Sequence, residues 1–303
     1  MKLPWRIRYS LLAGLAVLGM LPMAQAAKRD VGHAQLLAAY QQHEPRLRLG
    51  TGNLPLAVET QTQNELQSGE AYAIFDYPYG KVTETLRNAR NWCDIVPLLM
   101  NIKACTTQTL LSGTRITLYA GLKSYQPPGL ARALNYTYRV QVLDTEYFSA
   151  SLTADKTDAN SPPMTLEAMP LDAERTLVHV RYHWSTPLWL RMASDSYFAT
   201  VGAHKIGFST TGADPHGGPA YVSGINGAVE RNALRYYLAL DTFLSTDHAP
   251  EAGRFDQRLN HWFDLTERYP TQLHEMDKAN YLRTKRKERT QQLKLQQRLD
   301  ARR

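Results

Sequence analysis

Residues 178–184, VHVRYHW, carry two imidazoles and a guanidinium at alternate positions. On a β-strand, this alternation puts His179, Arg181 and His183 on one face and the apolar and aromatic residues on the other. If the basic face lines an interior cavity, the two histidines are candidates for general acid–base catalysis beside a cation. If that face meets solvent, the apolar face belongs to the core, and the sequence leaves both interpretations open. No third ligand is indicated by spacing, so we predict no metal site.

Two arginines in GAVERNALRYYLAL, residues 227–240, pose a second chemical question. Arg231 and Arg235 lie four residues apart, so they are neighbours on a helix, and no acid of that helix is spaced to pair with them. A guanidinium cannot discharge, so burial requires a partner. Either an acid on a neighbouring segment anchors each arginine, or the pair contacts the headgroup of a ligand.

The common catalytic and nucleotide-binding motifs are absent from the sequence. It contains no G-x-S-x-G elbow, Walker loop, G-x-G-x-x-G, H-E-x-x-H or C-x-x-C, so we predict no cofactor and find no support for nucleotide or redox chemistry. A Ser–His–Asp arrangement stays open only because all three residue types are plentiful. The seventeen tyrosines would suit a cavity for an amphipathic molecule, or would simply be core and sheet residues.

The N-terminus has the pattern of a secretory signal peptide. Lys2, Arg6 and Arg8 precede the apolar run LLAGLAVLGMLPM, and Ala24-Gln25-Ala26 forms an A-x-A cleavage site. We therefore expect cleavage after residue 26 and export to the periplasm; the alternative is an uncleaved N-terminal anchor.

The expected export to an oxidising compartment affects the oxidation state predicted for the two cysteines. Cys93 and Cys105 are close in sequence, and an oxidising compartment favours a disulfide between them, with two buried free thiols as the alternative.

The positive charge is concentrated at the ends of the chain. Of the net charge of +7, residues 1–26 contribute +3 and residues 278–303 contribute +8, which leaves the body at −4. An exported protein with an acidic body is a poor candidate for nucleic-acid binding. The basic tail either contacts a membrane surface, an acidic glycan or an acidic protein, or forms a solvated, fraying helix.

Hydrophobic periodicity predicts a strand, a helix, a meander of short strands and then long helices. GHAQLLAAYQQ has a short helical pattern, and HEPRLRLGTGN (43–53) is typical of a turn. The meander spans 113–184 and includes NYTYRVQVL (135–143), whose alternation puts Tyr136, Tyr138, Val140 and Val142 on one face. The later elements are helices at 188–204, 225–245 and 255–282, the last broken at Pro270, and short strands KIGFST and AYVSG around a turn at 212–219.

This order predicts an α+β fold in which a curved antiparallel sheet wraps around a long helix, with additional C-terminal helices. The segment YAIFDYPYGKVTETLRNARNWCDIVPLL resembles the opening of START-like helix-grip domains, the SRPBCC superfamily, in which a Trp often precedes an apolar, Pro-containing segment as Trp92 does here. WCDI, TVGAHKIGFS, YVSGINGAVERNALRYYLAL and ERYPTQLHEM resemble a family of exported proteobacterial proteins. The resemblance implies a cavity for an apolar ligand and no particular activity. The predicted ligand-binding residues are Arg231, Arg235, Tyr236, Tyr138, Arg181 and Trp92.

We therefore expect four parts: a signal peptide (1–26), an N-terminal helix and linker (27–53), a START-like domain (54–247) and a C-terminal helical extension with a basic tail (248–303). The leading hypothesis is an exported protein that binds a hydrophobic or amphipathic ligand, such as a lipid. A cyclase or hydrolase using the histidines and the arginine pair is one alternative. An envelope assembly or scaffold protein acting through its C-terminal helix is the other.

Overall fold

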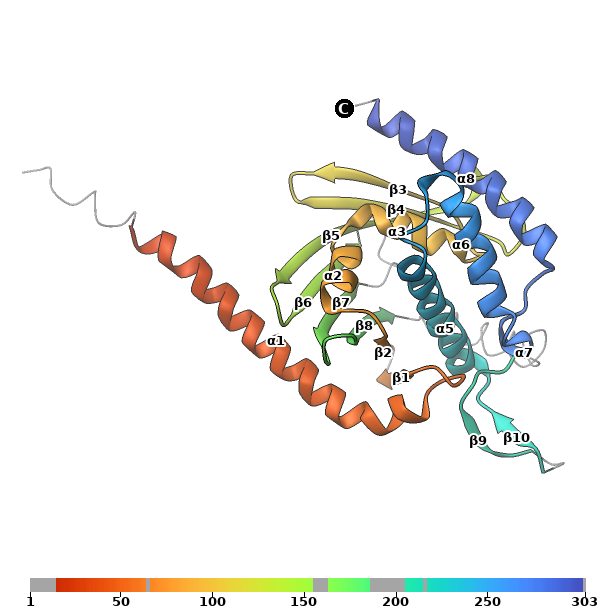
Figure 1. Cartoon of the computed structure of the whole chain (residues 1–303), viewed down its shortest axis with the longest axis horizontal. Coiled ribbons are helices and arrows are strands. Elements are labelled where there is room, and N and C mark those ends of the chain that lie inside the picture. The colour runs from red at the N-terminus through yellow and green to blue at the C-terminus, as the bar shows by residue number, and fades with distance from the viewer. Residues whose placement is uncertain (1–14, 64–65, 155–162, 186–204, 215–216, 302–303) are drawn as a thin grey trace, which may run out of the picture.

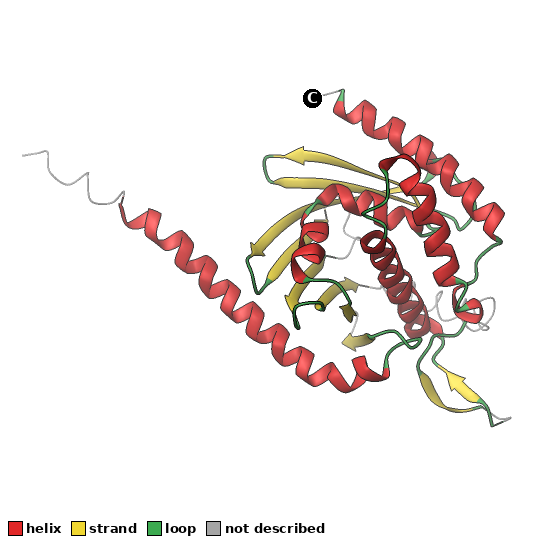
Figure 2. Cartoon of the chain, viewed as in Figure 1, coloured by secondary structure: helices red, strands yellow, loops and turns green. Residues whose placement is uncertain are grey.

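The structure is a computed structural model that describes residues 15–63, 66–154, 163–185, 205–214 and 217–301. Eight strands form one antiparallel sheet in the order β1-β2-β8-β7-β6-β5-β4-β3 (Figures 1 and 2). The strands are β1 (Leu56–Gln63), β2 (Leu66–Phe75), β3 (Ile102–Leu110), β4 (Gly113–Ala120), β5 (Arg132–Leu143), β6 (Phe148–Ala154), β7 (Met164–Pro170) and β8 (Thr176–Ser185).

Helices pack on both faces and at one edge of this sheet (Figure 1). They are α1 (Leu15–Leu49), α2 (Tyr79–Arg87), α3 (Ala89–Ile95), α5 (Gly224–Ser245), α6 (Glu251–Thr266), α7 (Pro270–Leu273) and α8 (Lys278–Asp300), with short 3-10 turns η1 (Val96–Leu98) and η2 (Pro128–Leu130). None of the described helices has an apolar stretch long enough to cross a bilayer. The predicted α+β fold, with a sheet around a long helix and further C-terminal helices, is confirmed.

The sheet has an apolar inner face that packs on the helices. Alternate residues of each strand enter a core that also contains α5, α2, α3 and α6; Phe75, Leu166 and Val178 are examples from β2, β7 and β8. Helix α5 crosses this face, and the stacked rings of Phe75 and Tyr237 join it to β2. The sheet therefore curves around α5, as the sequence pattern predicts.

A second apolar cluster lies on the opposite, outer face of the sheet. Helix α1 supplies Leu36 and Leu47, which pack on residues such as Leu177 of β8 and Met169 of β7. Because α1 covers the outer face, polar residues there can be buried as well. This cover decides the environment of His179.

Helix α1 is longer than its sequence pattern predicts. HEPRLRL belongs to the helix, which continues through Pro45 and ends at Leu49, so the predicted turn at 43–53 begins only at Gly50. Proline inside a helix is unfavourable because it removes a hydrogen bond and crowds the preceding turn. Here buried Leu47 and the hydrogen bond from Arg46 to the Val58 carbonyl (2.7 Å) hold the last turn in place.

Strand β5 departs from the predicted alternation. The register between β5 and β6 shifts between Val140 and Val142, so that Val140 pairs with Ala150 but Val142 pairs with Ser149. This β-bulge turns Val142 to the outer cluster, whereas Tyr138 faces the inner core. The prediction that Tyr136, Tyr138, Val140 and Val142 share one face is therefore wrong at Val142.

The later elements follow the prediction with shifted boundaries. The helix predicted at 225–245 is α5, and Pro270 does break the helical pattern of 255–282, between α6 and α7. The short hairpin lies nearer its turn than predicted, with β9 at Thr210–Ala213 and β10 at Pro219–Tyr221. The helix predicted at 188–204 lies outside the described residues.

Candidate functional site

The inner face of the sheet is apolar but not uniformly buried. Several of its side chains border the fully buried core while keeping accessible surface, although α5 crosses this face. They are Ala71, Leu118, Leu152, Val180 and Tyr182 of the sheet and Ala233 of α5. Partial exposure at the middle of a helix-covered sheet is unusual, because such positions normally pack at crystal-like density.

Tyr236 shows the same feature more strongly. It lies on the α5 stripe that includes Val229, Ala233 and Leu240, and 40% of its surface is accessible. Burial first, and then the nearby Tyr136 of β5, raise the pKa of Tyr236 to about 12. Tyr236 is therefore an accessible phenol on the side of α5 that neighbours Tyr136 and Tyr182 of the sheet.

Tyr182 brings a second phenol close to Tyr236. Burial raises the pKa of Tyr182 to about 12, with Tyr236 as its electrostatic neighbour. Its ring lies across Gly69 of β2, where a Cβ atom would come within 2.5 Å of the ring carbon Cζ. Glycine at this position therefore lets Tyr182 lie over the sheet. The sequence placed Tyr182 on the apolar face of VHVRYHW but did not single it out for ligand binding.

Trp92 and Tyr138 close one end of the inner core instead of facing open space. The Trp92 indole donates to the Leu86 carbonyl (3.2 Å), and the Tyr138 hydroxyl donates to the same oxygen (2.7 Å). Tyr138 is buried, and Trp92 packs against the core. Both predicted ligand-binding residues thus serve to fix α2 and α3 against β5.

Arg231 anchors α5 to the segment that leads into the β9–β10 hairpin. Its Nη1 donates to the carbonyl oxygens of Lys205 (2.7 Å) and Ile206 (2.8 Å). The adjacent Glu230 carboxylate accepts from the backbone amides of Phe208 (2.6 Å) and Ser209 (3.0 Å). The two charged side chains therefore hold the same loop by its carbonyl and amide groups.

Arg235 forms an ion pair with an acid on a neighbouring segment, as one of the two predicted alternatives requires. Its Nη2 lies 2.9 Å from Oε1 of Glu275, in the connection between α7 and α8, and both side chains are nearly inaccessible. Burial lowers the pKa of Arg235, and Glu275 opposes that shift. The predicted anchor to an acid on a neighbouring segment is therefore found for Arg235, whereas Arg231 is anchored by backbone carbonyl oxygens; the headgroup contact stays a prediction.

His179 and Arg181 point away from the inner core. Val178 and Val180, which alternate with them along β8, face inward, so the alternative of a polar cavity lining fails for both residues. The outer face is not solvent either, because His179 is 2% exposed beneath α1. His183 lies on β8, but its side chain is outside the described residues.

His179 bridges two carboxylates on the neighbouring strands. Its Nδ1 lies 2.9 Å from Glu167 of β7, and its Nε2 lies 3.0 Å from Glu70 of β2. Arg181 and Tyr72 also donate to Glu70, and Tyr147 donates to Glu167. These side chains form one hydrogen-bonded network beneath α1.

The protonation of this set follows from its hydrogen bonds. Hydrogen bonds from His179, Tyr72 and Arg181 lower the pKa of Glu70 to about 2, against the opposing effect of burial. Burial disfavours the imidazolium of His179, but Glu167 and Glu70 outweigh it and raise its pKa. Burial, the largest single effect, raises the pKa of Glu167, but hydrogen bonds from His179 and Tyr147 outweigh it and lower the pKa overall. The arrangement is therefore an imidazolium held by two carboxylates.

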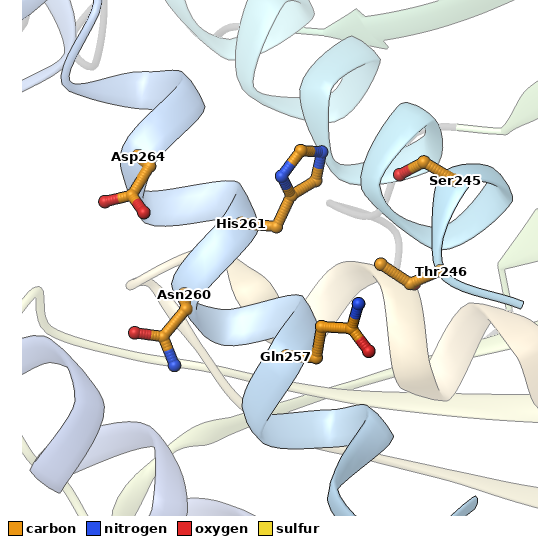
Figure 3. Close-up of a pocket in the computed structure, with 6 residues that line it drawn as sticks. All are labelled: Ser245, Thr246, Gln257, Asn260, His261 and Asp264. Atoms are coloured by element: carbon orange, nitrogen blue, oxygen red, sulfur yellow. The ribbon is translucent and has the colours of Figure 1, made fainter. Parts of the chain in front are cut away.

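A groove between the end of α5 and α6 brings serine, histidine and aspartate together (Figure 3). Its volume is about 300 Å³, and it is lined by Ser245, Thr246, Gln257, Asn260, His261 and Asp264. The Ser245 hydroxyl donates to the Thr242 carbonyl (3.1 Å), and Asp264 pairs with Lys278 (2.6 Å). With these bonds the serine and the aspartate are engaged elsewhere, so the groove does not form a catalytic triad in this geometry.

Cys93 and Cys105 form the predicted disulfide, which joins α3 to β3. Gln292 of α8 lies against it, accepting from the Cys105 amide (3.0 Å) and donating to the Cys93 carbonyl (2.8 Å). Gln296 accepts from the Thr107 amide and donates to the Thr107 carbonyl (2.8 and 2.9 Å). Side-chain amides of α8 thus take the place of a further strand along the edge strand β3.

Two buried lysines complete the contact between α8 and the sheet edge. Lys103 and Lys285 share the carboxylate of Glu288, at 3.0 and 2.8 Å, and donate to backbone carbonyls around β3. Burial lowers the pKa of Lys285 to about 8 in spite of Glu288. The predicted basic tail is therefore a docked helix, and part of its charge is internal.

Comparisons with known proteins give only remote structural similarity. No protein-family profile and no curated protein matches the chain. Among solved structures, a STAR-related lipid transfer protein from Xanthomonas axonopodis shares 14% identity over 49% of this chain and 90% of its own, with a TM-score of 0.34. Norcoclaurine synthase from Thalictrum flavum shares 5% identity over 49% and 82%, at 0.31. A conserved protein from Enterococcus faecalis shares 10% over 70% and 91%, at 0.32. Scores this low support no functional argument.

Proposed function

We propose that this chain is an exported START-like protein that holds an uncharged, amphipathic molecule between the inner face of the sheet and α5, without turning it over. The observation that carries the proposal is Tyr236, which is 40% accessible on the inner stripe of α5 although burial raises its pKa to about 12. Ligand sites are concave and mostly apolar, with a few placed polar groups. The half-buried apolar residues around Tyr236 and Tyr182 fit that description.

The proposed ligand is uncharged because of how the described charges of α5 are used. Arg231 bonds to backbone carbonyls and Arg235 pairs with Glu275, so neither faces the stripe of Tyr236. A phenol with a pKa near 12 keeps its proton at neutral pH and can donate to a neutral acceptor. A carbonyl, ether or hydroxyl oxygen on an otherwise apolar molecule would satisfy Tyr236.

The cyclase or hydrolase hypothesis requires His179, His183 and the two arginines to converge. His179 lies beneath α1 on the outer face, whereas the arginines lie on the side of α5 that contacts residues 205–206 and 275. That hypothesis therefore fails for His179. The scaffold hypothesis also loses support, since the buried side of α8 is occupied by β3 of its own chain.

Binding of an uncharged, polarity-sensitive fluorescent probe such as Nile red, with a long-chain alcohol as competitor, tests the proposal. Ala233→Trp should fill the inner space and lower probe binding at least about tenfold, since it adds a large ring beside Tyr236. Leu293→Trp on the exposed side of α8 is the matched control and should leave binding unchanged. Equal binding by both variants, each shown to be folded, would refute an inner site.

A further inference from the structure

The connection between β4 and β5 presents two leucines to solvent. Leu122 is 66% exposed and Leu130 is 75% exposed. Gln126 holds both ends of this loop, accepting from the Leu122 amide (2.9 Å) and donating to the Leu130 carbonyl (2.5 Å). The leucines are therefore displayed by a loop with its own internal bonds. We call residues 121–131 the leucine loop.

The leucine loop is fixed to α8. Gln291 donates to the Tyr125 hydroxyl (2.7 Å), and the Lys287 ammonium lies 3.8 Å from the centre of the Tyr125 ring. Lys103, buried at the sheet edge, donates to the Ser124 carbonyl (2.8 Å). The leucine loop is therefore held against α8 beside Lys287 and Gln291.

The exposed side of α8 is basic. Lys287, Lys294 and Arg298 are exposed and recur at intervals of seven and four residues, which places them on one side of the helix. Within the part of the chain that the structure describes, these three form no ion pair, whereas Arg286 pairs with Asp256 and Arg289 with Asp94. We call Lys287, Lys294 and Arg298 the basic strip.

We propose that the leucine loop and the basic strip together dock on an anionic lipid bilayer, the leucines entering the interface while the strip lies on the headgroups. Exposed leucines side by side with unpaired cations match both layers of such a surface, apolar chains below and negative charge above. Docking here would leave α1, on the outer face of the sheet, uninvolved.

The charges and the leucines have separable effects. Each basic residue at an anionic surface changes partitioning about fivefold, and salt screens this attraction over roughly 10 Å. Loss of all three charges of the basic strip should thus weaken binding by about 100-fold. The leucines should determine whether the loop enters the bilayer at all.

A site-specific probe on the full chain tests this proposal. The two native cysteines are joined in a disulfide, so Leu130→Cys provides one reactive thiol for a polarity-sensitive bimane label. Leu143→Cys, at the end of β5, is the control position, since Leu143 is also exposed (44%). The labelled chains are mixed with vesicles of phosphatidylglycerol or of phosphatidylcholine.

We expect a blue shift of the label at position 130 with phosphatidylglycerol vesicles, none with phosphatidylcholine, and none at position 143. The shift should be lost in high salt and should need about 100-fold more lipid when K287Q, K294Q and R298Q are added. The matched control R48Q/R90Q/R175Q removes three exposed cations elsewhere and should keep it. No shift at position 130, a shift that survives loss of the basic strip, or equal loss in the control would each overturn the proposal.

Discussion

The imidazole of His179 lies flat against the phenol ring of Tyr72, with ring centroids 4.2 Å apart and planes inclined by 8°. The same phenol stacks with His43 of α1 at 4.4 Å. Helix α1 is thus joined to the sheet through aromatic rings, and one of them is an imidazolium held between Glu70 and Glu167. This contact makes the stability of the outer face dependent on pH.

His179→Gln should remove that dependence. The folded-state pKa of His179 is raised, so its stabilising contribution is complete below the unfolded value of about 6.5 and is lost as the pH rises through the folded-state pKa. At pH 6 the free energy of unfolding of the variant should be about 2 kcal/mol lower, because the two half-buried carboxylates lose their shared cation. Urea denaturation at pH 6 and at pH 9 measures the difference.

The difference between wild type and His179→Gln should shrink at the higher pH. His248→Gln, an exposed histidine, is the control and should cost under about 0.5 kcal/mol at either pH. A His179→Gln penalty that stays constant from pH 6 to pH 9 would mean that the imidazole is neutral throughout.

Glu275→Gln tests how much the ion pair with Arg235 contributes to the free energy of unfolding. The substitution leaves a buried guanidinium without a charged partner, and we expect a loss of about 3–5 kcal/mol in the free energy of unfolding. Arg235→Met combined with Glu275→Met should recover most of it. Lys123, the other partner of Glu275, is half exposed, and Lys123→Gln should cost less than about 1 kcal/mol. Additive costs for the changes at 235 and 275 would argue against the pair.

Gln292→Ala should uncover the edge of β3. It removes the partners of the Cys105 amide and the Cys93 carbonyl, and unsatisfied buried groups cost about 1–3 kcal/mol each. Hydrogen exchange should accelerate at the Cys105 amide. Gln297→Ala, on the exposed side of α8, should change neither stability nor exchange. Unchanged exchange at Cys105 would show that α8 does not protect this edge.

Removal of the disulfide should act on stability and on α8 together. Cys93→Ala with Cys105→Ala opens a cross-link between residues twelve apart, worth about 3 kcal/mol in the chain-entropy model. Because Gln292 bonds to the backbone of both residues, exchange at the Thr107 amide, held by Gln296, should also accelerate. Thermal unfolding with and without reductant, beside exchange measurements, separates the two effects.

Local patterns were sufficient for the elements and the general fold. Alternation in VHVRYHW correctly divides β8 into an apolar and a basic face, and the apolar face meets α5. The same alternation cannot reveal what covers the basic face. That depends on α1. The sequence predicted a turn for the last residues of this helix because Pro45 disfavours a helix, and the burial of Leu47 that holds them cannot be predicted from the local sequence.

The contacts of α8 had no local signature at all. Its buried side presents Lys285, Glu288 and Gln292, which hydrophobic periodicity scores as solvent-facing. Lys285 and Gln292 are buried because they satisfy backbone groups of β3, more than 180 residues away in sequence, and Glu288 pairs with Lys103 of that strand. Likewise, Arg235 finds its acid at Glu275, beyond the reach of helical spacing rules.

Native mass spectrometry of the chain purified from its native host, followed by solvent extraction, tests the central claim most directly. The account predicts a bound, uncharged amphipathic molecule that is retained by the wild type and by Leu293→Trp, and is absent from Ala233→Trp. A folded wild-type chain that carries no such molecule and takes up none from added extract would contradict it.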